Sequence, residues 1–305
     1  MDTIEIKREN LVIVDANAIV HSSFHGYKPK LDQKGQDQRV LYGLLNTLAD
    51  LVDYFETVDY LFMVFDPADS ALYRKTVFPQ YKANRPPTDP DLKRQRDVAQ
   101  NVISNYLGLP TVSYPGYEAD DIIGSMSDIL AEKYEVTIVS PDKDLAQLVK
   151  PNVRMLRKTG VDSRKFYKFL DEEKVKEDFG VYPNQIADWL ALVGDAADNL
   201  PGLYRIGKAR AAEYLSLYRS IEDMFLIIND MEHKDLKEQL LANKERVELI
   251  RKLATVVRDL PVKESCDSAI IKAAKIREQE KYSVQLAYMQ NYFAWPEYIK
   301  QMFAS

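Results

Sequence analysis

Nine carboxylates stand directly after apolar segments or near the start of predicted helices. Asp15 follows residues 11–14 (LVIV) and Asp66 follows residues 60–65 (YLFMVF). The complete set is Asp15, Asp66, Glu118, Asp120, Asp121, Asp142, Asp144, Asp195 and Asp198. In open α/β sheets, sites form at the carboxyl ends of the strands. Each acid alone also has an ordinary explanation, as a helix cap, a turn residue or a partner of a helix dipole.

Taken together, these acids predict a metal site. Gathering carboxylates from five segments at one sheet edge is unfavourable unless a positive charge neutralises them. Oxygen ligands favour Mg²⁺ or Mn²⁺, and neither a histidine nor Cys266 lies at these strand ends to suggest zinc. Two ions about 4 Å apart would fit so many acids, and such pairs mainly serve phosphoryl transfer. Asp188 is excluded from this set and interpreted as part of a solvated helix face.

Two basic segments suit a polyanionic partner. Residues 67–100 carry seven cations against four acids, with Tyr73, Phe78 and Tyr81 among them. Such a segment can hold phosphates and stack on bases, although a solvated surface loop is the alternative. Residues 200–219 carry four cations against one acid, and a glycine there precedes a helix that could bind a backbone phosphate.

The elements that must position these residues form two patterns. Residues 11–14, 60–65 and 136–139 are short continuous apolar runs, typical of strands buried on both faces of a parallel sheet. Helical periodicity alternates with them, which predicts a doubly wound α/β layer. The expected helices are 39–57, 91–107 and 118–133, with edge-strand candidates at 153–156 and 166–170.

From residue 172 onward the pattern predicts helices alone. A glycine at 180 and a proline at 183 mark the end of one helix and the start of the next. The expected helices are 172–179, 183–193, 207–218, 221–228, a long charged helix over 234–258, and a tail over 269–303 with a break near Trp295.

Composition is that of an ordinary globular enzyme. The 305 residues suggest about two domains, and 46% are hydrophobic. A single cysteine forms no internal disulfide, and no apolar run approaches the roughly 20 residues that span a bilayer, so we expect a soluble intracellular protein. The net charge of −6 argues against nucleic acid, but without the nine acids the chain would carry +3.

The motifs resemble the 5′ nucleases related to flap endonucleases, including the 5′ nuclease domain of bacterial DNA polymerase I and stand-alone phage enzymes. They occur in the family's order over about residues 10–262. No polymerase region follows, so the resemblance is to a free-standing nuclease. The resembling motifs are Val-Asp15, Phe-Asp66, Tyr81-Lys-Ala-Asn-Arg85, Pro115-Gly-Tyr-Glu118-Ala-Asp120-Asp121, Asp142-Lys-Asp144-Leu and Gly194-Asp195-Ala-Ala-Asp198-Asn.

The resemblance implies a PIN-like α/β nuclease core at 1–171, with a mostly parallel sheet and a basic helical arch at about 67–100. It implies a helical DNA-binding part at 172–262, containing a helix-three-turn-helix segment at about 183–219, and a helical extension at 263–305. The first metal ion would be served by Asp15, Asp66, Glu118, Asp120 and Asp121, and the second by Asp142, Asp144, Asp195 and Asp198.

The resemblance also assigns the basic residues. Lys82 and Arg85 would hold the scissile phosphate, and Tyr81 would stack on the terminal base. The expected catalytic residues are Lys82, Arg85 and Asp144. Further DNA contacts are expected from Arg74, Lys75, Lys93, Arg94, Arg96, Gly202, Arg205, Gly207, Lys208 and Arg210. Arg205 stands where the family has a glycine in a turn that often binds K⁺. K⁺ binding is therefore doubtful, because the position favours positive φ and a guanidinium could replace the ion.

The predicted function is metal-dependent hydrolysis of DNA at or near 5′ ends, as a 5′-3′ exonuclease and flap endonuclease in replication or repair. The expected cofactors are two Mg²⁺ ions, with Mn²⁺ as a substitute. The expected partner is DNA with 5′ ends, flaps or nicks, with an RNA–DNA hybrid as a further candidate. The protein would be a monomer without membrane contact, in the cytoplasm of a bacterial or phage-infected cell. The alternatives are a PIN-type ribonuclease, a DNA-binding protein without catalysis, and a phosphatase using Asp142 and Asp144.

Overall fold

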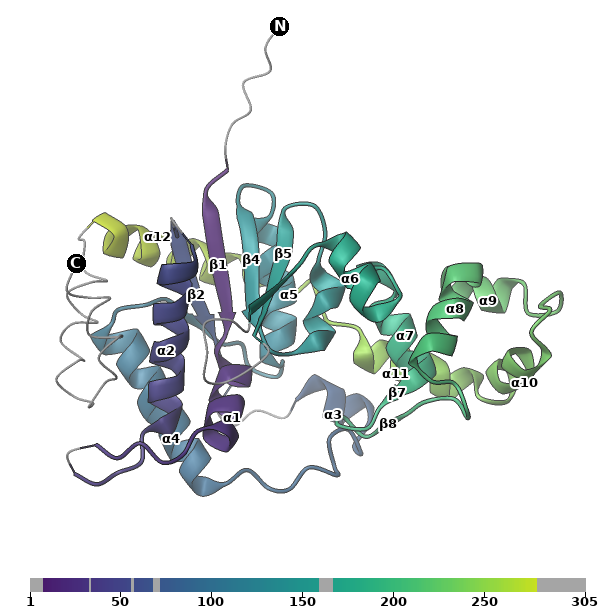
Figure 1. Cartoon of the computed structure of the whole chain (residues 1–305), viewed down its shortest axis with the longest axis horizontal. Helices are drawn as coiled ribbons and strands as arrows, with labels where there is room; N and C mark the ends of the chain where they lie inside the picture. The colour runs from purple at the N-terminus through teal and green to yellow at the C-terminus, as the bar shows by residue number, and fades with distance from the viewer. Residues whose placement is uncertain (1–7, 33, 56–57, 68–71, 159–166, 279–305) are drawn as a thin grey trace, which may run out of the picture.

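An α/β layer with a helical part extending from one side makes up the chain (Figure 1). This computed structural model describes residues 8–32, 34–55, 58–67, 72–158 and 167–278. No helix within those ranges is long and apolar enough to cross a bilayer.

The main sheet has the strand order β3-β2-β1-β4-β5-β6 in the described residues. Its strands are β1 (Asn10–Asp15), β2 (Tyr60–Val64), β3 (Thr111–Val112), β4 (Glu135–Ser140), β5 (Val153–Lys158) and β6 (Tyr167–Leu170). Among these six, only β6 is antiparallel to its neighbour. The predicted parallel layer is confirmed, and so are the two strands predicted at one of its edges, β5 and β6, whereas the two-residue strand β3 at the other edge was too short to be predicted.

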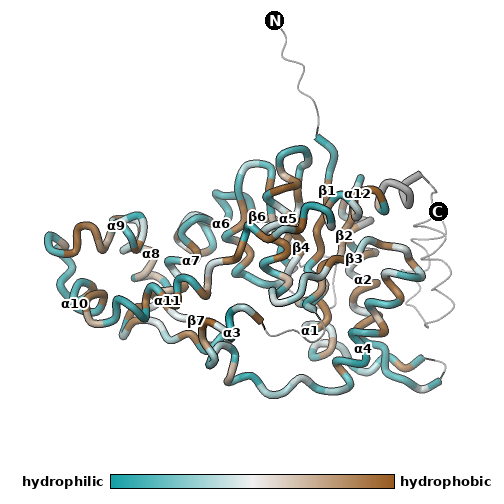
Figure 2. The backbone as a smooth tube through the Cα atoms, turned by 180° about the vertical axis from the view of Figure 1, so that it is seen from behind, coloured by the Kyte–Doolittle hydropathy of each residue, from teal (hydrophilic) through white to brown (hydrophobic). Residues whose placement is uncertain are grey.

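The strands are buried on both faces, as their continuous apolar runs indicate. Leu11 and Ile13 belong to one hydrophobic core and Val12 and Val14 to the other. Helices α1 (Ala16–Gly26), α2 (Arg39–Tyr54) and α4 (Pro90–Asn101) cover one face, and α5 (Ala119–Leu130) and α12 (Lys263–Glu278) cover the other. Figure 2 shows hydrophobic residues along the central strands and hydrophilic ones along the connection between α3 (Tyr73–Val77) and α4.

The helical part shares the core that α5 covers. Apolar residues of its helices belong to the same buried cluster as Leu11 and Ile13, so the two parts pack as one body. A short hairpin, β7 (Gly194–Asp195) and β8 (Leu200–Pro201), lies between its helices. The helices are α6 (Glu172–Phe179), η3 (Pro183–Gln185), α7 (Ile186–Val193), α8 (Lys208–Tyr218), α9 (Ile221–Leu226), α10 (Lys234–Ala242) and α11 (Lys244–Ala254).

Several predicted boundaries are corrected. The single helix expected over 234–258 is wrong, because Asn243 leaves the helical region (φ −129°) and separates α10 from α11. The helix expected over 91–107 ends in a π-helical turn, η1 (Val102–Tyr106), and α3 was not predicted as a helix. The tail helix begins earlier than expected, at Lys263, while residues 279–303, with the break expected at Trp295, lie outside the described residues.

Residues 255–262 run across α5 instead of continuing α11. The Val257 amide donates to Asp121 Oδ1 (2.9 Å) and the Leu260 amide to Ser125 Oγ (3.2 Å). A Cβ atom at position 124 would lie 2.5 Å from Val256 Cγ1, so this close crossing depends on Gly124. The crossing brings the end of the helical part back to the sheet, where α12 begins.

Candidate active site

Asp15 links two neighbouring strand ends. It ends β1 and caps α1, where its Oδ1 accepts a hydrogen bond from the Ala18 amide (2.9 Å). Its Oδ2 accepts from the Ser140 hydroxyl at the end of β4 (2.6 Å). With 1% of its surface exposed, this carboxylate is held inside the carboxyl edge of the sheet.

Asp66 follows the next strand and joins two helix starts. Its Oδ1 accepts from the Ala119 amide at the first position of α5 (2.7 Å), and its Oδ2 accepts from Asn17 Nδ2 in α1 (2.6 Å). The same edge therefore carries the acids of β1, β2 and α5, as the sequence predicted.

These acids repel one another across segments. Burial raises the pKa of Asp15 to about 7, and Asp142 and Asp66 add to the effect. Burial likewise raises the pKa of Asp66, and it raises that of Asp120 well above its ordinary value, helped by Asp142 and Asp15. The pKa of Asp144 rises to about 7 through burial and the charge of Asp142. An edge of this kind would be stabilised by a bound cation.

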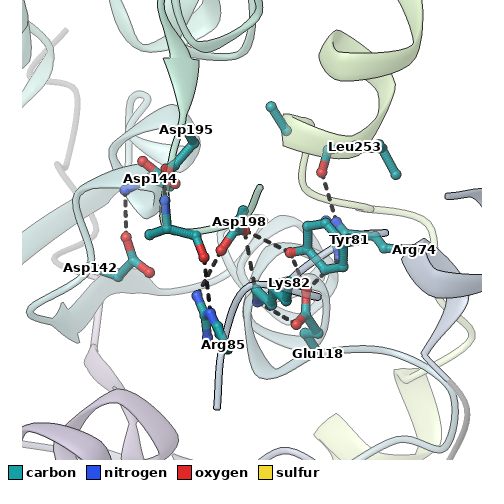
Figure 3. Close-up of polar contacts among 12 residues, drawn as sticks. Arg74, Tyr81, Lys82, Arg85, Glu118, Asp142, Asp144, Asp195, Asp198 and Leu253 are labelled. Atoms are coloured by element: carbon teal, nitrogen blue, oxygen red, sulfur yellow. Dashed lines mark hydrogen bonds and ion pairs between the residues drawn. The ribbon is translucent and has the colours of Figure 1, made fainter. Parts of the chain in front are cut away.

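Other carboxylates of the predicted set are already paired with cations (Figure 3). Lys82 Nζ lies 2.5 Å from Glu118 Oε1, and Arg85 donates to Asp198 Oδ1 (2.6 Å). Burial would raise the pKa of Glu118, but Lys82 and Arg74 outweigh it and the pKa is lowered. The segment that carries Lys82 and Arg85 therefore lies directly on the acid site.

Lys143 is a site residue that we did not predict. Its ammonium lies 2.9 Å from Asp144 Oδ1 and 3.2 Å from Asp195 Oδ2. Burial opposes its charge, but these two acids prevail and raise the pKa of Lys143, while Lys143 lowers the pKa of Asp195 despite burial. The signal was present, because Lys143 stands between Asp142 and Asp144 in the sequence.

Arg74 and Asp121 form a buried pair rather than parts of the open edge. Arg74 is 5% exposed and binds both oxygens of Asp121 (2.6 and 2.8 Å). It also donates to Glu118 Oε2 (3.2 Å) and to the carbonyls of Leu253 (2.7 Å) and Thr255 (3.1 Å). The expectation that Arg74 contacts DNA is therefore corrected, since its donors are all directed into the protein. Asp121, predicted as a metal ligand, is instead occupied by Arg74 and the Val257 amide.

Tyr81 does not present its ring for stacking. The residue is 2% exposed, and its hydroxyl oxygen lies within hydrogen-bond distance of both Glu118 Oε2 (2.9 Å) and Asp198 Oδ2 (2.8 Å). The expected stacking on a terminal base is therefore corrected for this conformation. The phenol instead joins an acid of α5 to an acid of the loop between β7 and β8.

The other basic residues of the arch segment differ in their surroundings. Lys75 and Lys93 are exposed. Arg94 pairs with Asp91 (2.7 Å) and Arg96 with Asp97 (2.9 Å). Arg96 also lies near enough to the edge to lower the pKa of Asp66, although burial dominates there.

The basic turn before α8 is exposed and open. Tyr204, Arg205, Gly207, Lys208 and Arg210 are exposed, whereas the flanking Leu203 and Ile206 are buried. Arg205 adopts the left-handed conformation that the family glycine suggested, with φ +57°. Nothing lies within 4 Å of a Cβ placed on Gly207, whereas Gly202 packs against the Val193 carbonyl. Arg210 pairs with Asp235 (3.1 Å).

A small cavity of about 20 Å³, room for about one water molecule, is lined by acids of both predicted groups. Asp120 lines one side, and Asp144, Asp195 and Asp198 line it as well. Within the described ranges, no three acidic, histidine or cysteine side chains converge closely enough to form a ready ion cage. The side chains predicted to bind metal are all carboxylates, and their oxygen atoms suit a hard divalent cation.

The interpretation of Asp188 as a solvated residue is wrong. It is 2% exposed, forms an ion pair with Arg251, and accepts from the Ile221 amide (3.2 Å). It is separate from the acid edge and fastens α7 to α9 and α11.

A parallel sheet with repelling acids at its carboxyl edge, and a cationic segment laid over them, defines an enzyme of the nuclease class. The chain belongs to the 5′-3′ exonuclease family: the family's N-terminal resolvase-like domain matches residues 10–180, and its C-terminal SAM fold matches residues 181–278.

Two curated relatives show the two contexts of this family. The chain is 36% identical over 265 residues to a 5′-3′ exonuclease of Aquifex aeolicus, with 87% of each chain covered. It is 33% identical over 263 residues to the DNA polymerase I of Bacillus subtilis, of which it spans 29% while 85% of this chain is covered.

Solved structures share the fold. T5 5′-exonuclease with bound zinc ions has a TM-score of 0.66 at 20% identity, covering 91% of this chain and 98% of that one. The catalytic core of Rad2 in complex with DNA substrate has a TM-score of 0.55 at 15% identity, covering 98% and 92%. The mostly parallel sheet with a helical second part is thus confirmed as the family fold.

Proposed function

We propose that this protein hydrolyses DNA phosphodiester bonds at or near 5′ ends, as a 5′-3′ exonuclease and flap endonuclease in replication or repair. One observation carries the proposal: repelling carboxylates at the sheet edge lie beside Lys82 and Arg85, two cations suited to a phosphate. DNA with 5′ ends, flaps or nicks is the proposed substrate, an RNA–DNA hybrid is a further candidate, and the protein acts as a monomer. The family membership and the relative named as a 5′-3′ exonuclease support this assignment.

Two groups of acids would hold divalent ions, with Mg²⁺ as the proposed cofactor and Mn²⁺ as its substitute. The first comprises Asp15, Asp66, Glu118 and Asp120, and the second comprises Asp142, Asp144, Asp195 and Asp198. When bound, divalent ions supply an activated water and neutralise charge on the phosphate. Asp121 is left out of the first group because both its oxygens bind the buried Arg74, whereas Glu118 is kept because its partner Lys82 is proposed to bind the phosphate instead. The divalent zinc ions bound to T5 5′-exonuclease, which shares this fold, support a metal cofactor.

The chain's own cations are proposed to bind the scissile phosphate. Without substrate, Lys82 pairs with Glu118 and Arg85 with Asp198. A phosphate that enters can replace these carboxylates as the anionic partner, which positions it beside Asp144. Negative charge that develops on the phosphate is then offset by fixed cations.

The basic turn before α8 is proposed to hold the duplex. Its exposed cations and the open space at Gly207 permit a backbone phosphate to approach the start of α8. In the arch, Lys75, Lys93, Arg94 and Arg96 remain proposed DNA contacts. Arg205 is proposed to take the place of K⁺ at the turn. The divisions at 1–171, 172–262 and 263–305 remain predictions.

The decisive experiment compares end-labelled 5′-flap, nicked and blunt duplexes in Mg²⁺, with EDTA as the control. We expect metal-dependent cleavage near the 5′ end, and loss of cleavage in Asp144→Ala with an unchanged circular dichroism spectrum. An RNA strand of the same sequence and a small phosphomonoester distinguish a ribonuclease and a phosphatase. Absence of metal-dependent cleavage on all three duplexes, or normal turnover by Asp144→Ala, contradicts the proposal.

A further inference from the structure

A second cationic pocket adjoins the acid site. A cavity of about 440 Å³ lies between β5, α6, α7 and the start of α8. Its walls include Lys143, Arg157, Asp178, Trp189 and Lys208. Apart from Lys143, none of these residues takes part in the acid site described above.

The charges of this pocket favour an anion. Three of its lining residues are cations, and its one acid, Asp178, already forms an ion pair with Lys168. Among the described residues, the Arg157 guanidinium makes only a long contact of 3.4 Å, with the Pro141 carbonyl. Lys143 already pairs with Asp144 and Asp195, so a phosphate group would meet the charges of Arg157 and Lys208, which the pocket's own acid does not offset.

The aromatic wall of the pocket is not a stacking platform. Trp189 is 2% exposed, and Phe179 packs edge-on against its ring with the centroids 6.0 Å apart. The indole Nε1 donates to the Lys208 carbonyl (3.1 Å). Because the ring is covered, the pocket can bind the phosphate of a nucleic acid without reading its base.

The pocket lies between the two places where DNA is proposed to bind. Lys143 also touches Asp144 and Asp195, and Lys208 begins the helix that follows the basic turn. DNA that reaches from the turn to Asp144 passes this wall. A backbone phosphate is therefore the anion most suited to it.

We propose that this pocket binds a backbone phosphate of the DNA substrate, away from the scissile position, with Arg157 as the main contact. The inference rests on the proposed function and adds a substrate-positioning residue to it. It is tested by DNA binding in EDTA, which needs no cleavage, so failure here is distinguishable from failure of the nuclease assignment.

The test compares Arg157→Gln with Arg154→Gln as the matched control. Arg154 lies on the same strand three residues away, so it faces the other side of the sheet, where its guanidinium lies 5.3 Å from the Phe169 ring. Anisotropy of a labelled flap duplex is measured over a range of salt concentrations. We expect Arg157→Gln to weaken binding several-fold and to reduce the salt slope by about 0.9, because one phosphate contact is lost. Arg157→Lys should retain most of the binding, and Arg154→Gln should bind as the wild type does.

Unchanged binding and slope in Arg157→Gln, or an equal loss in Arg154→Gln, overturns the proposal. Melting temperatures of the variants show whether a loss reflects unfolding. Inorganic phosphate and a 5′-mononucleotide are tested as competing ligands by calorimetry. If Arg157→Gln loses their binding but keeps that of the duplex, the pocket serves a free phosphate and the assignment to the DNA backbone is wrong.

Discussion

The predicted site acids have two opposite kinds of electrostatic surroundings. Burial and like charges raise the pKa of Asp15, Asp66 and Asp120. By contrast, Glu118, Asp121 and Asp198 form ion pairs with cations of the chain itself. Asp120 and Asp121 are adjacent in the sequence, yet they fall on different sides of this division. The comparison teaches that one acidic motif can have two roles. Some of its carboxylates would be stabilised by a bound cation, and others form internal ion pairs that hold the site together.

The buried pair gives the largest expected effect on stability. Asp121→Asn leaves the Arg74 charge buried without its bidentate partner, so we expect a loss of about 3–5 kcal/mol in the free energy of unfolding. Urea denaturation measures it. Asp120→Asn is the matched control, because it removes a repelled charge and should leave stability unchanged or higher. Equal destabilisation by the two variants would contradict the division.

Asp120→Asn, which should have little effect on stability, should have a large effect on the rate of DNA cleavage. Asp120→Asn removes a proposed metal ligand, so we expect the cleavage rate to fall by at least about 100-fold while the fold persists, since even outer-shell changes cost 10–100-fold. Single-turnover cleavage of the flap duplex measures this rate. A rate near that of the wild type would remove Asp120 from the proposed metal site.

Without bound metal, the free energy of unfolding should decrease as the pH rises from about 4 to about 7. The folded pKa values of Asp15 and Asp144 are raised to about 7, so the folded state binds more protons than the unfolded state within that window. Melting in EDTA at pH 5 and pH 8 tests this, and Mg²⁺ at pH 8 should raise the melting temperature by binding the folded state. A higher melting temperature at pH 8 than at pH 5 in EDTA would contradict the raised pKa values of Asp15 and Asp144 in the folded state.

The smallest expected change in the free energy of unfolding concerns the ion pair of Arg85 with Asp198. The side chain of Arg85 is 50% exposed where it meets Asp198, so Arg85→Gln should alter the free energy of unfolding by less than about 1 kcal/mol. The same variant should reduce cleavage, because Arg85 is proposed to hold the phosphate. Urea denaturation of Arg85→Gln and Asp121→Asn compares the two ion pairs. A small loss for Arg85–Asp198 and a large loss for Arg74–Asp121 would show that the first serves function and the second serves the fold.

The sequence predicted the elements better than it predicted the partners of individual side chains. The apolar runs that became β1, β2 and β4 determined where Asp15, Asp66 and Asp142 would lie, because parallel strands end at a common edge. The ion pair of Arg74 with Asp121 joins residues 47 positions apart and depends on the crossing of residues 255–262. No local pattern encodes such a contact. Asn243 shows the same limit, since its neighbours continue the helical periodicity across a break.

The return of the chain to the sheet through α12 has a mechanical consequence. The helical part leaves the sheet after Leu170 and rejoins the α/β layer at Lys263, so it has two covalent tethers to that layer. A load applied by DNA bound to the helices would be divided between the two connections. Rotation about one connection would strain the other. It would also move Asp195 and Asp198, which pair with Lys143 and Arg85 of the α/β layer.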